Sequence, residues 1–223
     1  IGDVRDYSRL LRAMEGVDTV FHVAAMKHVP SSEYNPFETV KTNVIGTQNV
    51  VDCAIEHEVE AVVYTSTDKA AGPTNVMGAT KLLAERLISA AHMHKGPRKT
   101  RFLSVRFGNI LGSRGSVVPR FELQAKRKQP LTITDPEMTR FFMTVQDAIK
   151  LILSAKERSR GGETFVFKMP VVSLGKLARA VWSVINESES FRYEILGLRP
   201  GEKMFEELLS EEEAERTLET SDM

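Results

Sequence analysis

The sequence lacks the features of a disulfide-stabilised, membrane-spanning or nucleic-acid-binding protein. Its 223 residues include one cysteine, Cys53, so no disulfide can form within the chain. No apolar run approaches the roughly 20 residues that a transmembrane helix needs. Thirty basic residues balance thirty acidic ones, and this absence of net charge gives no reason to expect nucleic acid or an anionic membrane as a partner. Hydrophobic residues make up 42% of the chain, enough for a substantial core.

Groups of metal ligands are lacking too. His28 has no second His, Cys or carboxylate at a ligand spacing, and His92 and His94 fall near a helix end. Cys53 and His57 lie one helical turn apart without a third partner, which favours packing over nucleophilic catalysis. We therefore expect no metal site, and a thiol buried in a cytoplasmic protein.

A Gly-rich turn between a first strand and a first helix is missing as well. Such a turn brings backbone amides to the pyrophosphate of a dinucleotide. The chain begins at Ile1, without an initiator methionine. We expect the missing unit to precede Ile1 in the intact protein, so that the 223 residues are a fragment.

Strands alternate with helices in the first half of the chain. Apolar, β-branched runs predict strands at 19–24, 61–64 and 102–107, and helical spacing predicts long helices over 36–56 and 77–94. This alternation predicts the α/β class, with a doubly wound, Rossmann-like parallel sheet. Its amino-terminal strands would be among the missing residues.

The pattern changes beyond Asn109 and predicts a smaller carboxy-terminal lobe. Shorter elements are expected there: strands near 131–133, 164–167 and 191–198, and helices over 117–128, 145–156 and 174–184. The acidic run from Glu211 onward reads as a solvated or frayed end. We assign residues 1–110 to a dinucleotide-binding domain and residues 111–223 to the smaller lobe, the two being interleaved rather than independent.

The stretch 64–81 combines the most chemistry. The strand that ends near Tyr64 delivers a hydroxyl, a carboxylate and an amine to one loop, and the following helix places Met77 and Lys81 on one face. In open parallel sheets, ligands bind beyond the carboxyl ends of the strands, where the loops 24–30, 65–73 and 106–116 are expected. The alternative is that these loops are polar only because they are solvated.

Two arginines in the second half suit an anionic ligand. Arg199 lies in a turn that opens a helix, and Arg140 lies beside aromatic residues. A guanidinium fork can bind a phosphate with two hydrogen bonds. A charged surface turn is the alternative interpretation.

Eight short motifs occur in a fixed order along nearly the whole chain. They are Gly2–Asp6, His22–Pro30, Lys41–Thr47, Ser66–Ala70, Val105–Asn109, Gly112–Pro119, Met138–Phe141 and Arg199–Lys203. Together they resemble the extended short-chain dehydrogenase/reductases of surface-polysaccharide biosynthesis. The likeness extends to UDP-N-acetylglucosamine 4,6-dehydratases, including the branch that also inverts C5.

The resemblance implies a tightly held NADP or NAD, a UDP-sugar substrate and a homo-oligomer. In this family a hydride leaves sugar C4, a base removes the C5 proton, an acid helps to expel the C6 hydroxyl as water, and the hydride returns to C6. By resemblance, Asp68 is the acid, Lys69 the base at C5, and Thr67 orients the sugar. Lys81 would bind the nicotinamide ribose. The other implied residues are Asp3, Ala24, Ala25, Lys27 and Asn43 for the cofactor, and Asn109, Arg114, Ser116, Thr139, Arg140, Arg199 and Glu202 for the UDP-sugar.

Met77 departs from the usual pattern of the superfamily, which has tyrosine four residues before the lysine. A thioether cannot accept the proton of the C4 hydroxyl. One branch of the dehydratases also carries methionine there, so we interpret the chain as a Met-x-x-x-Lys dehydratase. Two alternatives stay open: a UDP-sugar epimerase, which needs Lys69 but not Asp68, and a non-catalytic nucleotide-sugar-binding fragment. A binding protein would gain nothing from a lysine that must be desolvated.

Overall fold

The computed structural model describes residues 1–187 and 190–223, which divide into two compact units. The first unit contains residues 1–107, 149–168 and 207–223, and the second contains residues 108–148 and 169–206. The chain therefore leaves the first unit at Phe107, near the boundary expected at residue 110, and returns to it twice.

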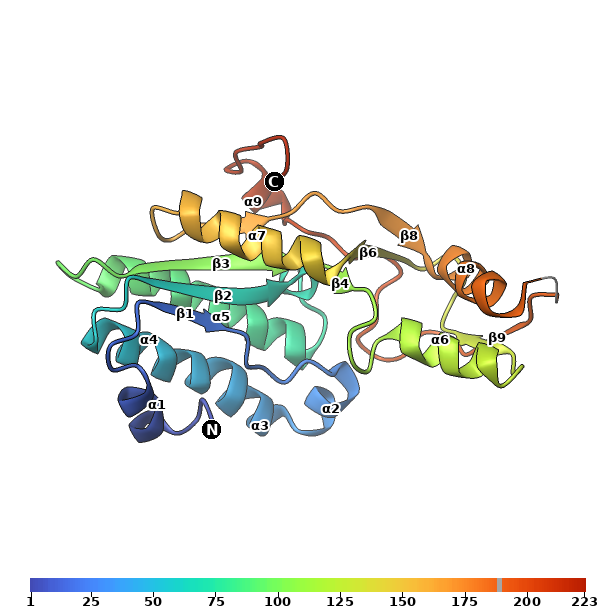
Figure 1. Ribbon diagram of the computed structural model, residues 1–223, viewed down its shortest axis with the longest axis horizontal. Helices are drawn as coiled ribbons and strands as arrows, with labels where there is room; N and C mark the ends of the chain where they lie inside the picture. The colour runs from blue at the N-terminus through green and yellow to red at the C-terminus, as the bar shows by residue number, and fades with distance from the viewer. Residues whose placement is uncertain (188–189) are drawn as a thin grey trace. The chain divides into compact units, whose positions relative to one another are not determined.

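The first unit is built on a parallel sheet (Figure 1). Its strands are β1 (Thr19–His22), β2 (Ala61–Thr67), β3 (Arg101–Phe107) and β7 (Thr164–Val166), in the order β1-β2-β3-β7. All of their pairings are parallel. Burial of β2 and β3 along almost their full length matches their apolar sequences, because a parallel sheet is covered on both faces.

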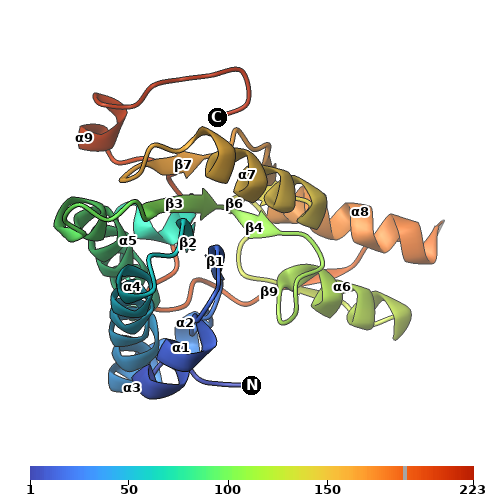
Figure 2. The ribbon, with the colours of Figure 1, turned by 60° about the vertical axis from the view of Figure 1, so that its left-hand side comes forward.

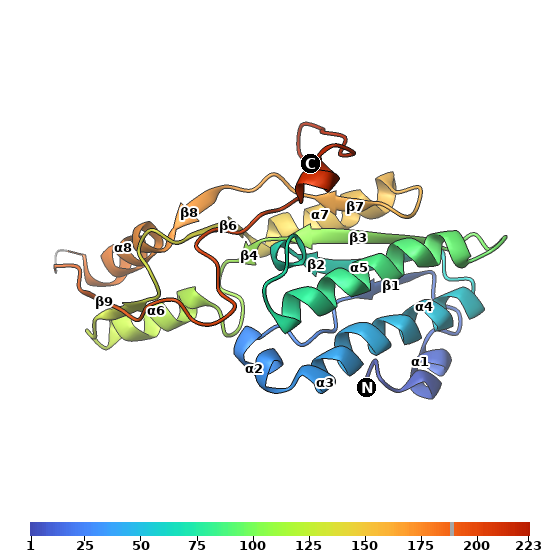
Figure 3. The same cartoon turned by 180° about the vertical axis from the view of Figure 1, so that it is seen from behind.

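Helices cover both faces of this sheet (Figure 2). One face carries α4 (Gly46–Glu56) and α5 (Val76–His94), with α1 (Tyr7–Ala13) packed on α4, and the other carries α7 (Val145–Arg158). Figure 3 shows α4 and α5 in front of the strands. Val62, Phe102, Ala84 and Ile88 meet in the core between the sheet and these helices. The predicted doubly wound α/β fold is confirmed.

The helix predicted over 36–56 is not uniform. It consists of α3 (Pro36–Val40), a π-helical turn η1 (Lys41–Ile45) and then α4. Within the loop expected at 24–30, residue 29 already begins a further helix, α2 (Val29–Tyr34), which has proline in its first turn.

The second unit contains shorter strands and two packed helices. The strands are β4 (Asn109–Ile110), β6 (Thr139–Met143) and β8 (Val171–Ser173) in one sheet, and β5 (Leu131–Ile133) with β9 (Tyr193–Ile195) in another. The helices α6 (Val117–Lys126) and α8 (Leu174–Asn186) pack on each other around Phe121 and Trp182.

Two expectations about the second half of the chain were wrong. The strand near 164–167 is β7, and it extends the main sheet beside β3 instead of belonging to the smaller lobe. The helix expected over 145–156 is α7, and from residue 149 onward it belongs to the first unit as well. The acidic end was expected to be solvated or frayed. It is largely exposed, as expected, but it also forms α9 (Glu211–Ala214), where Glu213 pairs with Arg106 of the first unit. Within the described residues, no helix is both long and apolar enough to cross a membrane.

Candidate functional site

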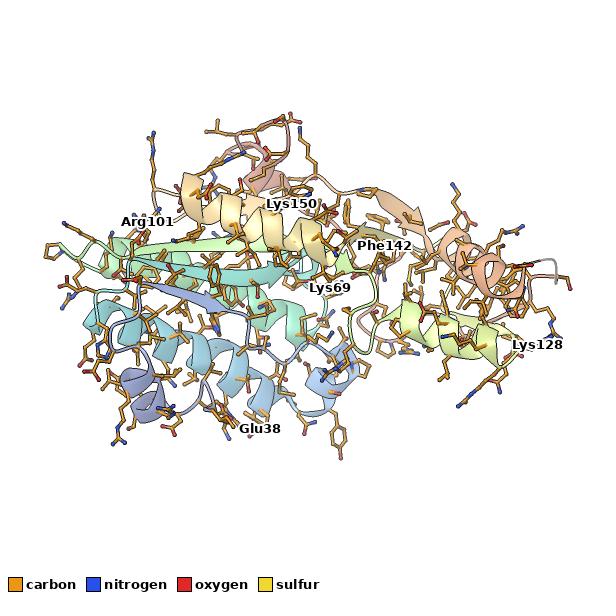
Figure 4. The ribbon with its side chains drawn as sticks, viewed as in Figure 1. Glu38, Lys69, Arg101, Lys128, Phe142 and Lys150 are labelled. Carbon is orange, nitrogen blue, oxygen red and sulfur yellow. The ribbon has the colours of Figure 1, made fainter. Side chains whose placement is uncertain are left out.

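Three predicted catalytic residues meet at the carboxyl end of β2. Thr67 ends the strand, and Asp68 and Lys69 begin the short 3₁₀ helix η2 (Asp68–Ala70). Figure 4 labels Lys69 at this point. Oδ1 of Asp68 accepts hydrogen bonds from Thr67 Oγ1 and from Lys69 Nζ, each at 2.8 Å. The side chain of Asp68 is fully buried and that of Lys69 is 20% exposed, so solvent reaches the amine but not the carboxylate.

Two polar atoms at the same strand end are buried without a hydrogen-bond partner in the described part of the chain. They are Oδ2 of Asp68 and Oγ of Ser66. An unsatisfied buried oxygen costs about 1–3 kcal/mol. Such a cost at the carboxyl end of a parallel strand is a mark of a ligand site.

Lys81 and Met77 lie together on the buried face of α5, as their spacing predicts. Nζ of Lys81 donates to the backbone oxygen of Thr65 at 2.5 Å and lies 4.1 Å from the centre of the Tyr64 ring. Burial lowers the pKa of Lys81 to about 7. The ammonium is therefore poised to lose its proton near neutral pH.

The start of α5 is held against η2 by two local features. Asn75 caps the helix, its Oδ1 accepting the backbone N–H of Gly78 at 2.8 Å. Gly78 leaves room for the backbone oxygen of Lys69, which a Cβ atom at that position would strike. The absence of a side chain at Gly78 thus lets the start of α5 pack against the backbone of η2.

Asn43, predicted on the cofactor side, organises the loop after β1 from the centre of the π-helical turn. Its Oδ1 accepts the N–H of Met26 at 2.7 Å, and its Nδ2 donates to the backbone oxygen of Met26 and to Thr80 Oγ1. Ala24 and Ala25 immediately precede this anchored residue. Asn43 is therefore placed to act by fixing the loop backbone.

Asp3 and Lys27 are the remaining residues predicted for the cofactor. Both are exposed. Hydrogen bonds from Arg5 lower the pKa of Asp3 to about 2, so the Asp3 carboxylate is ionised and held by the guanidinium. Arg5 also pairs with Glu38, which ties this amino-terminal segment to α3.

The residues predicted for the UDP-sugar all belong to the second unit. Asn109 and Thr139 begin β4 and β6 and are half-buried. Ser116 is the residue before α6, and its Oγ is buried without a partner in the described residues. Arg114, in the preceding turn, is exposed.

The two predicted arginines differ in their surroundings. The Arg140 guanidinium is buried and donates to backbone oxygens of Thr139, Lys203 and Met204, so it connects β6 to the segment after Arg199. Arg199 is exposed, and its N–H donates to Glu202 at 3.2 Å. Arg199 can bind a phosphate as it stands, whereas Arg140 supports the backbone.

Two residues near these sites were not singled out from the sequence. Arg120 of α6 is half-buried, donates to the backbone oxygen of Thr132 at 2.9 Å, and has a buried Nε without a partner in the described residues. Burial and the charge of Arg199 lower its pKa. Glu85 lies one turn after Lys81 and is buried. The sequence could have indicated both, because Arg120 lies four residues after Ser116 and Glu85 lies four residues after Lys81, each on the same helix face as the earlier residue.

Comparison with known proteins identifies the family of this chain. A family model described as "polysaccharide biosynthesis protein" matches residues 1–223. The chain belongs to this family. A UDP-N-acetylglucosamine 4,6-dehydratase (inverting) of Campylobacter jejuni is 46% identical over 220 residues, which are 98% of this chain and 64% of that protein. A UDP-glucose 4-epimerase of Rickettsia canadensis is 45% identical over 213 residues, covering 96% of this chain and 62% of that protein.

Two further proteins are more similar to this chain in sequence. An uncharacterized membrane protein of Methanocaldococcus jannaschii is 54% identical over 228 residues, covering 100% of this chain and 68% of that protein. The X-ray structure of Pen from Bacillus thuringiensis superposes with a TM-score of 0.96 at 52% identity and covers 100% of this chain and 70% of that one. The chain thus spans about two thirds of the length of these proteins.

Proposed function

We propose that this chain is the larger part of a nucleotide-sugar 4,6-dehydratase that acts on UDP-N-acetylglucosamine and inverts C5. The observation that carries the proposal is the ion pair between Asp68 Oδ1 and Lys69 Nζ, 2.8 Å apart at the carboxyl end of β2. Loss of water from adjacent carbons needs an acid and a base side by side. The similarity to a UDP-N-acetylglucosamine 4,6-dehydratase supports this choice of reaction and substrate.

The ion pair can supply both catalytic groups without exchanging protons with solvent. Transfer of one proton along the hydrogen bond from Lys69 to Asp68 gives a neutral amine and a carboxylic acid. The amine then removes the C5 proton of the 4-keto sugar, and the acid protonates the C6 hydroxyl, which leaves as water. The pair returns to its ionised state, so the protons of the elimination step balance. The proton that leaves O4 in the first oxidation would be released to solvent, and the proton that C5 regains when the hydride reaches C6 would come from solvent. Thr67, which already donates to Asp68 Oδ1, would orient the sugar.

The first unit fits a nicotinamide cofactor. Ser66 Oγ is buried at the end of β2 without a partner in the described residues, and the buried Lys81 ammonium has three donors, of which Thr65 accepts one. Ala24, Ala25 and the Asn43-anchored loop would face the same ligand. When bound, NADP or NAD would accept the hydride from C4 and return it to C6. Lys81 would bind its ribose.

The second unit would bind the UDP group. Arg199 and Arg114 are exposed there, and Ser116 Oγ is buried without a partner in the described residues. Glu202 is half-buried and holds the N–H of Arg199. Asn109 and Thr139 lie at strand ends in the same unit. An arginine fork is well suited to a diphosphate.

The direct test uses the intact protein that contains this chain. Incubation with UDP-N-acetylglucosamine and NADP should yield a product lighter by one water, detected by mass spectrometry. In deuterated water, one deuteron at C5 of the product, seen by NMR, would show that the C5 proton was removed and replaced, and the NMR spectrum of the product would give the configuration at C5. A product of unchanged mass would reject dehydration.

An epimerase is the second candidate, favoured by the similarity to a UDP-glucose 4-epimerase. An epimerase that used Lys69 as its base would need no acid at Asp68. A product of unchanged mass but altered configuration, formed equally fast by Asp68→Asn, would establish this candidate. Binding of UDP-N-acetylglucosamine without any turnover would instead indicate a binding protein.

A further inference from the structure

A buried ionic network in the first unit joins three segments that are far apart in the sequence. Arg106 of β3 is 0% exposed. Its Nε and Nη2 donate to the two carboxylate oxygens of Glu85 at 3.1 and 2.6 Å, and its Nη1 and Nη2 donate to those of Glu213 at 2.9 and 3.0 Å. Nη1 also donates to the backbone oxygen of Leu208 at 2.6 Å. These bonds use all five N–H donors of a guanidinium.

Glu213 brings the carboxy-terminal segment, residues 207–223, into this network. A capping box at the start of α9 fixes its carboxylate, because the N–H of Ser210 donates to Glu213 Oε2 while Ser210 Oγ accepts the N–H of Glu213. Hydrogen bonds from Arg106 lower the pKa of Glu213 to about 2, so the group is ionised at neutral pH. Figure 2 shows α9 on the β3–β7 side of the sheet.

Glu85 connects the network to the active-site lysine. Glu85 lies one helical turn after Lys81 on α5, and the two residues are 3% and 6% exposed. Burial tends to remove the proton of Lys81, and the negative charge of Glu85 opposes that effect on its pKa. Arg106 carries a positive charge beside Glu85. If it neutralised Glu85 completely, Glu85 would no longer raise the pKa of Lys81.

The other titratable groups on the elements around Lys81 add no net negative charge. Burial lowers the pKa of His22 on β1 to about 3 and raises that of Tyr64 on β2 well above its usual value, so both are neutral. Asp68 and Lys69 on η2 form an ion pair of zero net charge. Arg86 on α5 also faces Glu213, but its side chain is exposed and its charge is screened by solvent. Among the buried groups described, Glu85 and Arg106 cancel, which leaves Glu213 as the source of the net charge of the network.

We propose that Glu213 is a positioning residue for Lys81, acting through Arg106 and Glu85 to keep the lysine side chain protonated and in place in the buried site. The carboxy-terminal segment is then part of the working active site although it touches neither substrate nor cofactor. The inference rests on the proposed function only in treating Lys81 as an active-site residue.

The test is a titration of Lys81 in the intact protein that contains this chain. With ¹³Cε-labelled lysine, the Lys81 signal is the one that Lys81→Met removes, and its shift is followed from about pH 5 to pH 10. We expect a midpoint near pH 7 in the wild type, about one pH unit lower in Glu213→Gln, and lower still in Glu85→Gln.

The matched control loosens the same segment without touching the network. Asp222 pairs with Arg158 at 3.1 Å on the surface, and Asp222→Asn should leave the Lys81 midpoint unchanged. If Glu213→Gln moves the midpoint no more than Asp222→Asn does, the proposal is overturned.

A second variant covers the case in which Glu213→Gln does not fold. Replacing the whole network by Glu85→Leu, Arg106→Met and Glu213→Leu removes its net charge and leaves no buried charge unpaired. The Lys81 midpoint should fall by about one pH unit in this triple variant as well, and an unchanged midpoint would reject the proposal. Since the titration needs neither cofactor nor substrate, failure of the dehydration assay would not affect its result.

Discussion

Gly78 lies directly against the backbone oxygen of Lys69, so that a Cβ atom at residue 78 would collide with it. The same Cβ would lie 3.1 Å from Pro73. Alanine is normally about 1 kcal/mol better than glycine inside a helix. At this position we expect the reverse: Gly78→Ala should lower the free energy of unfolding by roughly 1–3 kcal/mol, because the obstacle is backbone rather than a flexible side chain. Urea denaturation measures the change.

The neighbouring residue provides the control for this prediction. Ala79 is exposed on the same turn of α5. Ala79→Gly should cost about 1 kcal/mol from helix propensity alone. If Gly78→Ala proved stabilising, α5 could not lie as close to η2 as the structure shows.

The strand, loop and helix around Gly78 could be predicted because their signals are local. The run that predicts β2 ends at Tyr64, and the strand continues to Thr67. Asn75 caps the helix, as asparagine commonly does. The π-helical turn could not be foreseen, because its central residue Asn43 is held by Met26 and Thr80, which lie 17 and 37 residues away.

The candidate site was predictable to the same extent. Adjacency in sequence brings Asp68 and Lys69 together, and helical spacing brings Met77 and Lys81 to one face. A pattern cannot tell what an arginine fork will bind. Arg140 was expected in the UDP-sugar site, and that role stays a prediction. The pattern gave no sign that its guanidinium would also donate to backbone oxygens of Lys203 and Met204. The return of Glu213 to Arg106 depends on a contact between residues 107 positions apart.

Asp68→Asn tests the role of the acid. Asparagine keeps the shape of the side chain but cannot deliver the proton that the departing C6 hydroxyl needs. We expect the rate of water loss by the intact protein to fall by about 10²–10⁴-fold, the usual contribution of a general acid. Mass spectrometry of the reaction over time measures it. Asp52→Asn, at an exposed carboxylate bound by Gln48, should leave the rate unchanged.

His22 predicts a specific loss of stability in acid. The ring is 3% exposed, and its Nε2 lies 2.8 Å from Thr47 Oγ1. Burial lowers the pKa of His22 from 6.5 to about 3. Between pH 6.5 and pH 3, His22 is therefore protonated in the unfolded chain but not in the folded one. Stability must therefore fall as the pH drops below 6.5. From pH 6.5 to 5 this group alone should cost about 2 kcal/mol.

A variant without the buried ring isolates that contribution. His22→Gln should lower the free energy of unfolding at pH 7, but its deficit relative to the wild type should shrink by about 2 kcal/mol at pH 5. Urea denaturation at both pH values measures this difference. The exposed His28→Gln should show no such change. A constant deficit for His22→Gln would mean that the buried ring accepts a proton in the folded state.

The buried Lys81 should make the protein more stable as the pH rises above 7. Burial lowers its pKa from 10.5 to about 7, so above pH 7 the unfolded chain holds a proton that the folded chain has released. Below pH 7 the folded chain bears the full free-energy cost of burying the protonated amine of Lys81. This cost decreases as the pH rises from 7 toward 10.5. Its relief should raise the free energy of unfolding by about 2 kcal/mol between pH 7 and pH 9.

Lys81→Met removes this titration, and Lys95→Met serves as the matched control. Lys95 also donates to a backbone oxygen, that of Thr100 at 2.7 Å, but is only half-buried. Relative to the wild type, Lys81→Met should lose about 2 kcal/mol between pH 7 and pH 9, whereas Lys95→Met should differ from it by the same amount at both values. Parallel behaviour of the two variants would show that Lys81 keeps its proton up to pH 9. The amine would then be fixed as a charged ligand and could not exchange a proton during the reaction.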